Sequence, residues 1–122
     1  MNLCELIKKA LLIYKEDETI VGCMAILPEN DPPYRTISSW KKDYSIVIHR
    51  VLVDPAVQNK GIAKAMLDYA KQYGTQHGYE SIKIDTHLDN YKMRRFLEKN
   101  GFIEGDYIEV MDRIAYELIL ED

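Results

Sequence analysis

The sequence predicts an α/β protein, an α+β mixed sheet in which strands alternate with two amphipathic helices. A β-branched run over 44–53 carries apolar residues at successive positions, as a central strand buried on both faces does. Two segments, 60–73 and 89–99, have helical periodicity. The first follows the run 44–53, and the second follows another strand-like run, 81–87. Strands interleaved with helices in this order are typical of α/β folds.

Before the central strand, the pattern predicts a short helix and an antiparallel hairpin. The helix is expected over Leu3–Ala10 and leads into a strand near Leu11–Lys15. Residues 17–18 form the turn, and Ile20–Leu27 is the returning strand. Gly22 lies inside that strand, which indicates a bulge or a close approach of another backbone or side chain.

The rest of the chain continues the alternation after one long irregular segment. Residues 28–43 are polar and rich in proline, and loops of this length are usually functional or disordered. Helix 60–73 has an apolar face and ends near Gly74 and Gly78. Strand 81–87 and helix 89–99 follow, with a stop at Asn100-Gly101. Two last strands are expected near Phe102–Val110 and Ile114–Leu120.

Composition places the chain among ordinary globular proteins. Its 122 residues suffice for one domain spanning 1–122, and the 47% hydrophobic and 30% charged content is typical of a folded core and a charged surface. No apolar run approaches the roughly 20 residues of a membrane span. A net charge of −4 without a basic stripe argues against nucleic-acid binding. Cys4 and Cys23 lack metal-ligand or redox spacing, so we expect no metal and a reducing, cytoplasmic location.

The loop after the central strand has the character of an anion site. Gln58, Asn59, Lys60 and Gly61 stand directly before an amphipathic helix. The first N–H groups of a helix have no partner within it, and its macrodipole favours negative charge there. Gly61 permits close backbone approach and Lys60 adds a positive charge, so the segment predicts a pyrophosphate cradle. The glycine patterns of dinucleotide-binding folds and P-loops are absent.

Two motifs at matching separation resemble those of the GNAT family of acyl-CoA N-acyltransferases. The loop Gln58-Asn59-Lys60-Gly61-Ile62-Ala63 fits the family's pattern Arg/Gln-x-x-Gly-x-Gly/Ala for acyl-CoA. The strand and helix of 81–102 resemble the second family motif, which is matched in register by Asn90, Phe96, Glu98, Lys99, Gly101 and Phe102. The resemblance covers residues from about 10 to 120, and the chain is most similar to small bacterial members.

The resemblance implies a fold, a co-substrate and a set of binding residues. The sheet would splay between strands 44–53 and 81–87, and the flanking helices would be 60–73 and 89–99. Acetyl-CoA would be the co-substrate, with no metal, and the acceptor would be a primary amine of a small molecule or of a protein. Binding residues would include Asn90 on the pantetheine arm, backbone groups of Val51, Leu52 and Val53, and the pyrophosphate loop Gln58, Asn59, Lys60, Gly61, Ile62 and Ala63.

The catalytic acid and base are not given by the family pattern. Leu97 stands where many members have a tyrosine that acts as the general acid, and Val47 stands where others have a glutamate. His49 is the leading base, because imidazole titrates near neutrality and the resemblance puts it beside the reaction centre. The alternative is a histidine without catalytic duty. His87 is the second base candidate, and the acid candidates are Tyr44, Tyr107 and Tyr116.

The chain also departs from the family at its N-terminus, where most of the usual first strand and helices are not recognisable. Those elements usually shape the acceptor pocket, and an uncovered apolar surface would favour a homodimer. The long loop 28–43 is expected to border the acceptor site, with Tyr34 and Trp40 either as wall residues or as local anchors. Two alternatives to an N-acetyltransferase stay open: a non-catalytic acyl-CoA-binding protein, and an α/β domain without an acyl-CoA site.

Overall fold

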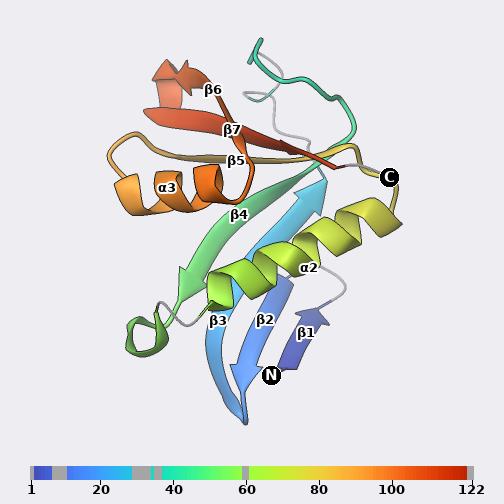
Figure 1. Ribbon diagram of the computed structural model, residues 1–122, viewed down its shortest axis with the longest axis vertical. Helices are drawn as coiled ribbons and strands as arrows, with labels where there is room; N and C mark the ends of the chain where they lie inside the picture. The colour runs from blue at the N-terminus through green and yellow to red at the C-terminus, as the bar shows by residue number, and fades with distance from the viewer. Residues whose placement is uncertain (1, 7–10, 29–33, 35–36, 59–60, 121–122) are drawn as a thin grey trace.

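The computed structural model describes residues 2–6, 11–28, 34, 37–58 and 61–120, which form one seven-stranded mixed sheet with two α-helices on it (Figure 1). The strand order is β1-β2-β3-β4-β5-β7-β6. The strands are β1 (Asn2–Leu6), β2 (Leu11–Glu16), β3 (Thr19–Pro28), β4 (Ser45–Val53), β5 (Ser81–His87), β6 (Ile103–Ile108) and β7 (Arg113–Ile119). The helices are α2 (Ile62–Gln76) and α3 (Tyr91–Lys99), with short 3-10 turns at Pro55–Val57 and Glu109–Met111. This confirms the predicted α/β mixed sheet.

The prediction of a helix over Leu3–Ala10 was wrong, because β1 occupies Asn2–Leu6. This strand pairs antiparallel with β2, from Asn2 opposite Lys15 to Leu6 opposite Leu11. The pairing satisfies backbone groups of β2 that would otherwise form an open edge. A helix of so few residues is marginal by itself, so the long-range ladder outweighs its local preference. Residues 7–10 of the expected helix lie outside the described residues.

The central strand β4 contains a bulge at Arg50. His49 lies opposite Ala25 of β3 and Val51 lies opposite Met24, so that Arg50 is an extra residue without a partner. Its φ angle of 56° lies in the left-handed region, which residues other than glycine rarely adopt. The bulge shifts the alternation of side chains, because Val51 packs on the same core as Ile48 instead of facing away from it.

The strands β4 and β5 separate after a short parallel ladder, as predicted. Ser45–Val47 pair with Ser81–Lys83, and no further pairing joins the two strands in the part of the chain that the structure describes. Each strand is held by its other neighbour: β4 pairs with β3 as far as Val53, and β5 pairs with β7 along its whole length. Figure 1 shows β4 turning away from β5 at this point. The edge of β4 that faces β5 is therefore open over its second half.

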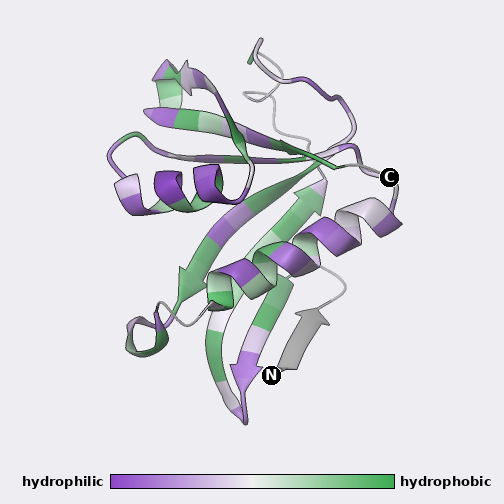
Figure 2. Ribbon diagram, in the orientation of Figure 1, coloured by the Kyte–Doolittle hydropathy of each residue, from purple (hydrophilic) through white to green (hydrophobic). Residues whose placement is uncertain are grey.

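Both helices cover the same face of the sheet and enclose the main core. Figure 2 shows hydrophobic and hydrophilic residues alternating along both helices, which lie on largely hydrophobic strands. Met66, Leu67 and Ala70 of α2 and Leu97 of α3 are buried in this core. The predicted close approach at Gly22 is confirmed, since a Cβ there would lie 3.1 Å from Cγ2 of Ile62 and 3.3 Å from Cε of Met66.

The helix α2 ends at Gln76, beyond the predicted bound of 73 but between Gly74 and Gly78, the two glycines that the sequence analysis placed at its end. Gly74 is buried in the last turns of the helix, and a Cβ there would lie 2.7 Å from Cδ1 of Leu120. A glycine at this position therefore serves close packing, and the chain leaves the helix only at His77 and Gly78, whose φ of 78° is left-handed.

The opposite face of the sheet is covered by part of the long loop. Tyr34 and Ile37 are buried against Val47, Ile108 and Ala115, with Trp40 packed on them. The loop is fastened by Glu117 of β7, which is 3% exposed. Its carboxylate accepts hydrogen bonds from the backbone N–H groups of Lys41 (2.7 Å) and Lys42 (3.2 Å) and from Oγ of Ser81 (2.7 Å).

We therefore expect Glu117→Ala to lower the free energy of unfolding by about 3 kcal/mol, because it leaves buried donors without their charged acceptor. Glu98→Ala is the matched control, since Glu98 is exposed on α3 and its loss should change stability by less than about 0.5 kcal/mol. Urea denaturation of both variants measures the difference. Equal stability of the two would contradict the role given to Glu117.

Candidate functional site

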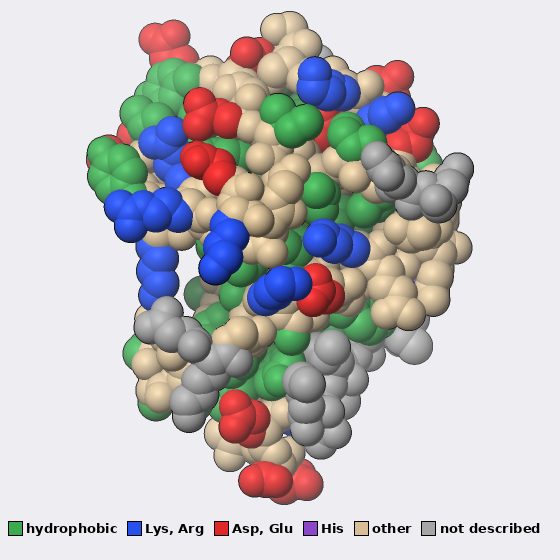
Figure 3. Space-filling model, in the orientation of Figure 1, with side chains coloured by type: hydrophobic (Ala, Val, Ile, Leu, Met, Phe, Trp, Pro, Cys, Tyr) green, Lys and Arg blue, Asp and Glu red, His purple; other side chains and the backbone are tan. Residues whose placement is uncertain are grey.

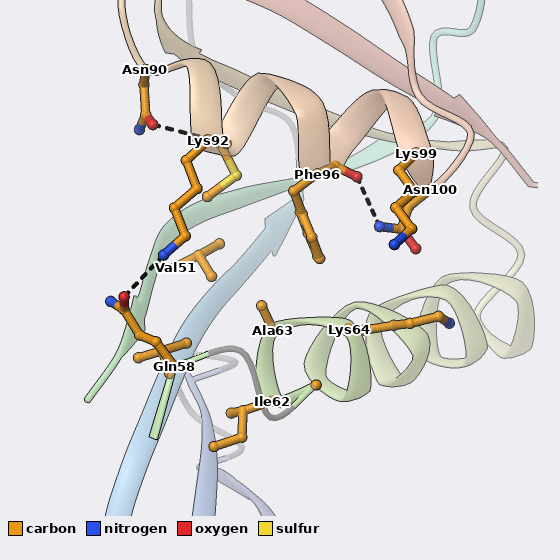
Figure 4. A pocket seen from close by; sticks show the side chains of 13 residues that line it. Val51, Gln58, Ile62, Ala63, Lys64, Asn90, Lys92, Phe96, Lys99 and Asn100 are labelled. Carbon is orange, nitrogen blue, oxygen red and sulfur yellow. Dashed lines mark hydrogen bonds between the residues drawn. The ribbon is translucent and has the colours of Figure 1, made fainter. Parts of the chain in front are cut away.

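A cavity of about 570 Å³ opens where β4, the start of α2 and the inner face of α3 meet (Figure 4). The separation of β4 from β5 creates this space, and α3 forms its roof. Its walls are made by Val51, Val53, Gln58, Gly61, Ile62, Ala63, Lys64, Asn90, Lys92, Met93, Phe96, Lys99 and Asn100. Seven of these residues belong to the binding set that the sequence analysis singled out.

One end of this cavity is the loop that leads into α2. The 3-10 turn Pro55–Val57 is capped by Asp54, whose Oδ1 accepts from the N–H of Ala56 at 2.9 Å. Gly61 then caps α2 with a left-handed φ of 78°, and a Cβ there would find no heavy atom within 4 Å. Because no side chain caps this end of the helix, its first N–H groups remain available to a ligand. Asn59 and Lys60 lie outside the described residues.

Three lysines give this cavity a positive wall. Figure 3 shows basic side chains gathered on this face over α3 and the neighbouring part of α2. Lys92 of α3 donates from Nζ to Oε1 of Gln58 at 2.9 Å, so that the two side chains bridge the opening (Figure 4). Lys99 lies two turns further along α3, and Lys64 pairs with Asp68 at 3.0 Å. Together with the N-terminus of α2, these charges favour a polyanion.

Sequence reasoning named Lys99 only as a match to the second motif, and it did not name Lys92 or assign either lysine to a ligand. Their separation of seven residues puts them on one face of α3, and this was the available signal. The same helix presents Met93 and Phe96 to the cavity beside Val51 and Val53 of β4. The cavity thus combines a cationic end with an apolar middle, which suits a long ligand with an anionic head.

Asn90 stands at the junction of β5 and α3 and has a structural task. Its Oδ1 accepts from the N–H of Met93 at 3.1 Å and thereby caps α3. Such a cap is worth roughly 1 kcal/mol of helix stability. Asn90 also lines the cavity, so the predicted contact with a ligand there is compatible with the capping.

A second, more polar cavity of about 290 Å³ adjoins the first. It lies between the separated parts of β4 and β5. Its walls are made by Ile48, His49, Arg50, Val51, Ile84, Asp85, Thr86, Asn90, Met93 and Arg113. Val51, Asn90 and Met93 line both cavities, so the two cavities are adjacent.

His49 is half-buried in the wall of the polar cavity and does not line the larger one. Leu52 lines neither cavity, and its side chain is 59% exposed on the other face of β4. His87 lies at the end of β5, where its Nε2 is 3.0 Å from the carboxylate of Asp112. Of these three side chains, the structure therefore brings only that of His49 to the polar cavity.

None of the three tyrosines considered as acids lines either cavity among the described residues. Tyr44 stacks on Tyr79 with ring centroids 4.5 Å apart. The Tyr107 hydroxyl donates to Asp112, and this hydrogen bond raises the pKa of Tyr107 above its ordinary value. Tyr116 is buried in the main core, where burial raises its pKa although its hydroxyl accepts from Arg94 Nε at 3.0 Å.

Tyr34 and Trp40 act as local anchors, one of the two roles left open for them. The Tyr34 hydroxyl donates to Asp85, and Nε1 of Trp40 donates to the carbonyl oxygen of Tyr34 at 2.9 Å. Neither lines a cavity in the part of the chain that the structure describes, although Tyr34 supports a wall residue of the polar one.

Within the described ranges, no group of three His, Cys, Asp or Glu side chains has the arrangement of a metal site. The helices among these residues are also too short or too polar to cross a membrane.

Comparison with known proteins identifies relatives over most of the chain. Residues 4–102 match the family model described as the Acetyltransferase (GNAT) family. The uncharacterized N-acetyltransferase YhfO of Bacillus subtilis is 27% identical over 97 residues, which cover 80% of this chain and 60% of that protein. N-acetyltransferase 8 of Homo sapiens is 24% identical over 90 residues, covering 74% of this chain and 37% of that protein. The chain thus spans 37–60% of the length of these curated relatives.

Solved structures share the fold at low sequence identity. A GNAT family acetyltransferase from Streptococcus agalactiae has a TM-score of 0.77 and 22% identity, covering 92% of this chain and 66% of that one. A GNAT family acetyltransferase from Elizabethkingia anophelis with acetyl-CoA bound has a TM-score of 0.73 and 18% identity, covering 94% and 78%. These likenesses establish the arrangement of the splayed sheet and its two helices.

Proposed function

The chain belongs to the acetyltransferase (GNAT) family, and on this premise we propose that it transfers the acetyl group of acetyl-CoA directly to a primary amine within a ternary complex. The observation that carries the proposal is the pair of adjoining cavities. The larger one combines lysines with apolar residues, as an acyl-CoA requires, and the smaller, more polar one would hold the amine. A structure related to this fold was solved with acetyl-CoA bound.

The larger cavity would hold the acyl-CoA from its phosphates to its thioester. The pyrophosphate would lie on the first N–H groups of α2 beside Gly61, with Lys92 and Lys99 supplying positive charge. The pantetheine arm would run along the open edge of β4 near Val51–Val53 and add to it by backbone hydrogen bonds, as an extended peptide would. The thioester would then reach the wall that the two cavities share.

Starting from the ammonium ion, the nitrogen loses two protons and the sulfur gains one. The amine nitrogen, once the first proton has left, attacks the thioester carbonyl; a C–N bond forms, the C–S bond breaks and the second proton leaves the nitrogen to water, so that the products are an amide and the CoA thiolate. We propose His49 as the base that takes the proton of the ammonium, since it lines the amine's chamber. The backbone N–H groups of β4 near Leu52 would stabilise the developing oxyanion.

The thiolate can take its proton from water, because a thiol has a pKa of roughly 8.5 and its anion is a competent leaving group. This route agrees with the finding that Tyr44, Tyr107 and Tyr116 line neither cavity. The same finding supports the second candidate function, a non-catalytic acyl-CoA-binding protein. Release of free CoA in the presence of a panel of amines separates the two candidates.

Gly61→Asp should abolish binding of acetyl-CoA, because a carboxylate at the start of α2 repels the pyrophosphate. The affinity measured by calorimetry should fall at least a hundredfold. The saturating thermal stabilisation, roughly 2.7 kcal/mol at a hundred times the dissociation constant, should vanish with it.

Gly78→Asp is the matched control for this variant. Gly78 also has a φ of 78°, a Cβ added to it would meet no heavy atom within 4 Å, and it lies at the other end of α2. The two variants therefore suffer the same backbone strain, and only the Gly61 variant should lose the ligand. Equal affinities of the two variants would exclude the proposed cradle.

His49→Gln should lower kcat by about 10²–10⁴ without changing the affinity for acetyl-CoA, because the general base is lost and the larger cavity is untouched. The control is His77→Gln, since His77 lies exposed at the C-terminal end of α2 and stacks on Tyr73 at 4.1 Å. Steady-state kinetics over a range of pH measure both. A kcat within threefold of the wild type would rule out His49 as the base.

A further inference from the structure

Among the described residues that line the polar cavity, one carries a carboxylate, and this carboxylate is fixed in place. Asp85 of β5 has a side chain that is 13% exposed. Its Oδ1 accepts from Nε of Arg113 at 2.7 Å, and its second carboxylate oxygen accepts from the Tyr34 hydroxyl. Arg113 also donates to the backbone carbonyl oxygen of Asp85 at 3.0 Å. The carboxylate is therefore held by three elements, β5, β7 and the long loop, and each of its oxygens keeps acceptor capacity for a further donor.

Arg50 is a second charged residue at this cavity; it is exposed and lies at the bulge in β4. It is the residue that has no partner in β3 and a left-handed φ of 56°. Bulges are enriched beside active sites because they redirect a side chain. Arg50 lines the cavity and forms no ion pair with any other residue that the structure describes. Its positive charge is thus available to a ligand, whereas that of Arg113 is compensated by Asp85.

This distribution of charge bears on which amines the cavity accepts. A primary amine arrives as an ammonium ion at neutral pH. The ion pair of Asp85 with Arg113 is close to neutral as a whole, so the charge of Arg50 leaves the chamber positive while His49 is neutral. A simple ammonium ion is repelled there. A molecule that carries a carboxylate as well can place its ammonium group on Asp85 and its carboxylate on Arg50, which satisfies both charges.

We propose that the acceptor is a small amino acid: a primary amine with a carboxylate on the same short skeleton, bound between Asp85 and Arg50. This inference rests on the proposed function and specifies its second substrate. The volume of about 290 Å³ suits a small molecule. Asp85 is then a binding residue for the amine, Arg50 a specificity residue for the carboxylate, and Tyr34 and Arg113 are positioning residues for Asp85.

The test compares each amino acid with its own primary amide as acceptors for acetyl-CoA. Glycine with glycinamide and β-alanine with β-alaninamide are suitable pairs, because each pair differs in charge and hardly in shape. The amine of the amide loses its proton more readily, so its intrinsic reactivity works against the expected preference. We expect kcat/KM for the amino acid to exceed that for its amide at least tenfold in one pair or more.

Arg50→Gln should reduce that preference to less than threefold, because it raises KM for the amino acid and, by removing the repulsion of the ammonium group, lowers KM for the amide. Arg95→Gln is the control, since Arg95 is exposed on α3 and lines neither cavity. Asp85→Asn should raise KM for both members of a pair. Because Asp85 is partly buried, the thermal unfolding of the Asp85→Asn protein is measured as well. If that protein does not fold, the Arg50→Gln variant alone tests the inference.

Calorimetry with acetyl-CoA on the same samples separates two kinds of failure. The inference would be overturned if the amides were turned over as well as the amino acids or better, or if Arg50→Gln kept the preference unchanged. It would also be overturned if the protein bound acetyl-CoA but turned over neither member of any pair. Failure to bind acetyl-CoA would instead overturn the proposed function on which the inference rests.

Discussion

The structure depends on the place where β4 and β5 stop pairing. Each strand is committed to a different partner, β4 to β3 as far as Val53 and β5 to β7 as far as His87. After Val47 and Lys83 the two halves of the sheet follow these partners and diverge. Unpaired backbone groups away from water are costly, so an open edge in the middle of a sheet needs water or a ligand. In this chain both cavities lie along that opening.

The bulge at Arg50 adapts β4 to this opening. It lets Ile48 and Val51, on either side of the extra residue, both pack on the core under the helices. It also places a guanidinium beside the polar cavity, at the cost of an unfavourable backbone conformation of roughly 1–3 kcal/mol. One irregular residue thus shapes the apolar wall of the larger cavity and contributes charge to the smaller one.

Much of the fold and of the larger cavity could be predicted because the signals are local. Gly61 precedes an amphipathic helix, Asn90 begins another, and the β-branched run of β4 marks a central strand. The prediction of a short helix near the N-terminus was wrong because the deciding interaction is not local. The strand β1 is stabilised by pairing with β2, which local propensity does not reveal.

The polar cavity could not be predicted in detail from the sequence. Tyr34, Asp85 and Arg113 are 51 and 28 residues apart along the chain, and only the pairing of β5 with β7 and the path of the long loop bring them together. Similarly, simple alternation along β4 does not reveal the bulge at Arg50, which depends on the register with β3.

The most direct test of the account is amide hydrogen exchange of the chain with and without saturating acetyl-CoA. If the ligand lies along the open edge, the amides of Val51–Val53 and of the first turn of α2 should exchange more slowly when it is bound, while β2 and the outer strand β6 stay unchanged. Binding that leaves exchange of these amides unaltered, or that protects a different part of the sheet, would contradict the assignment of the cavity to acyl-CoA.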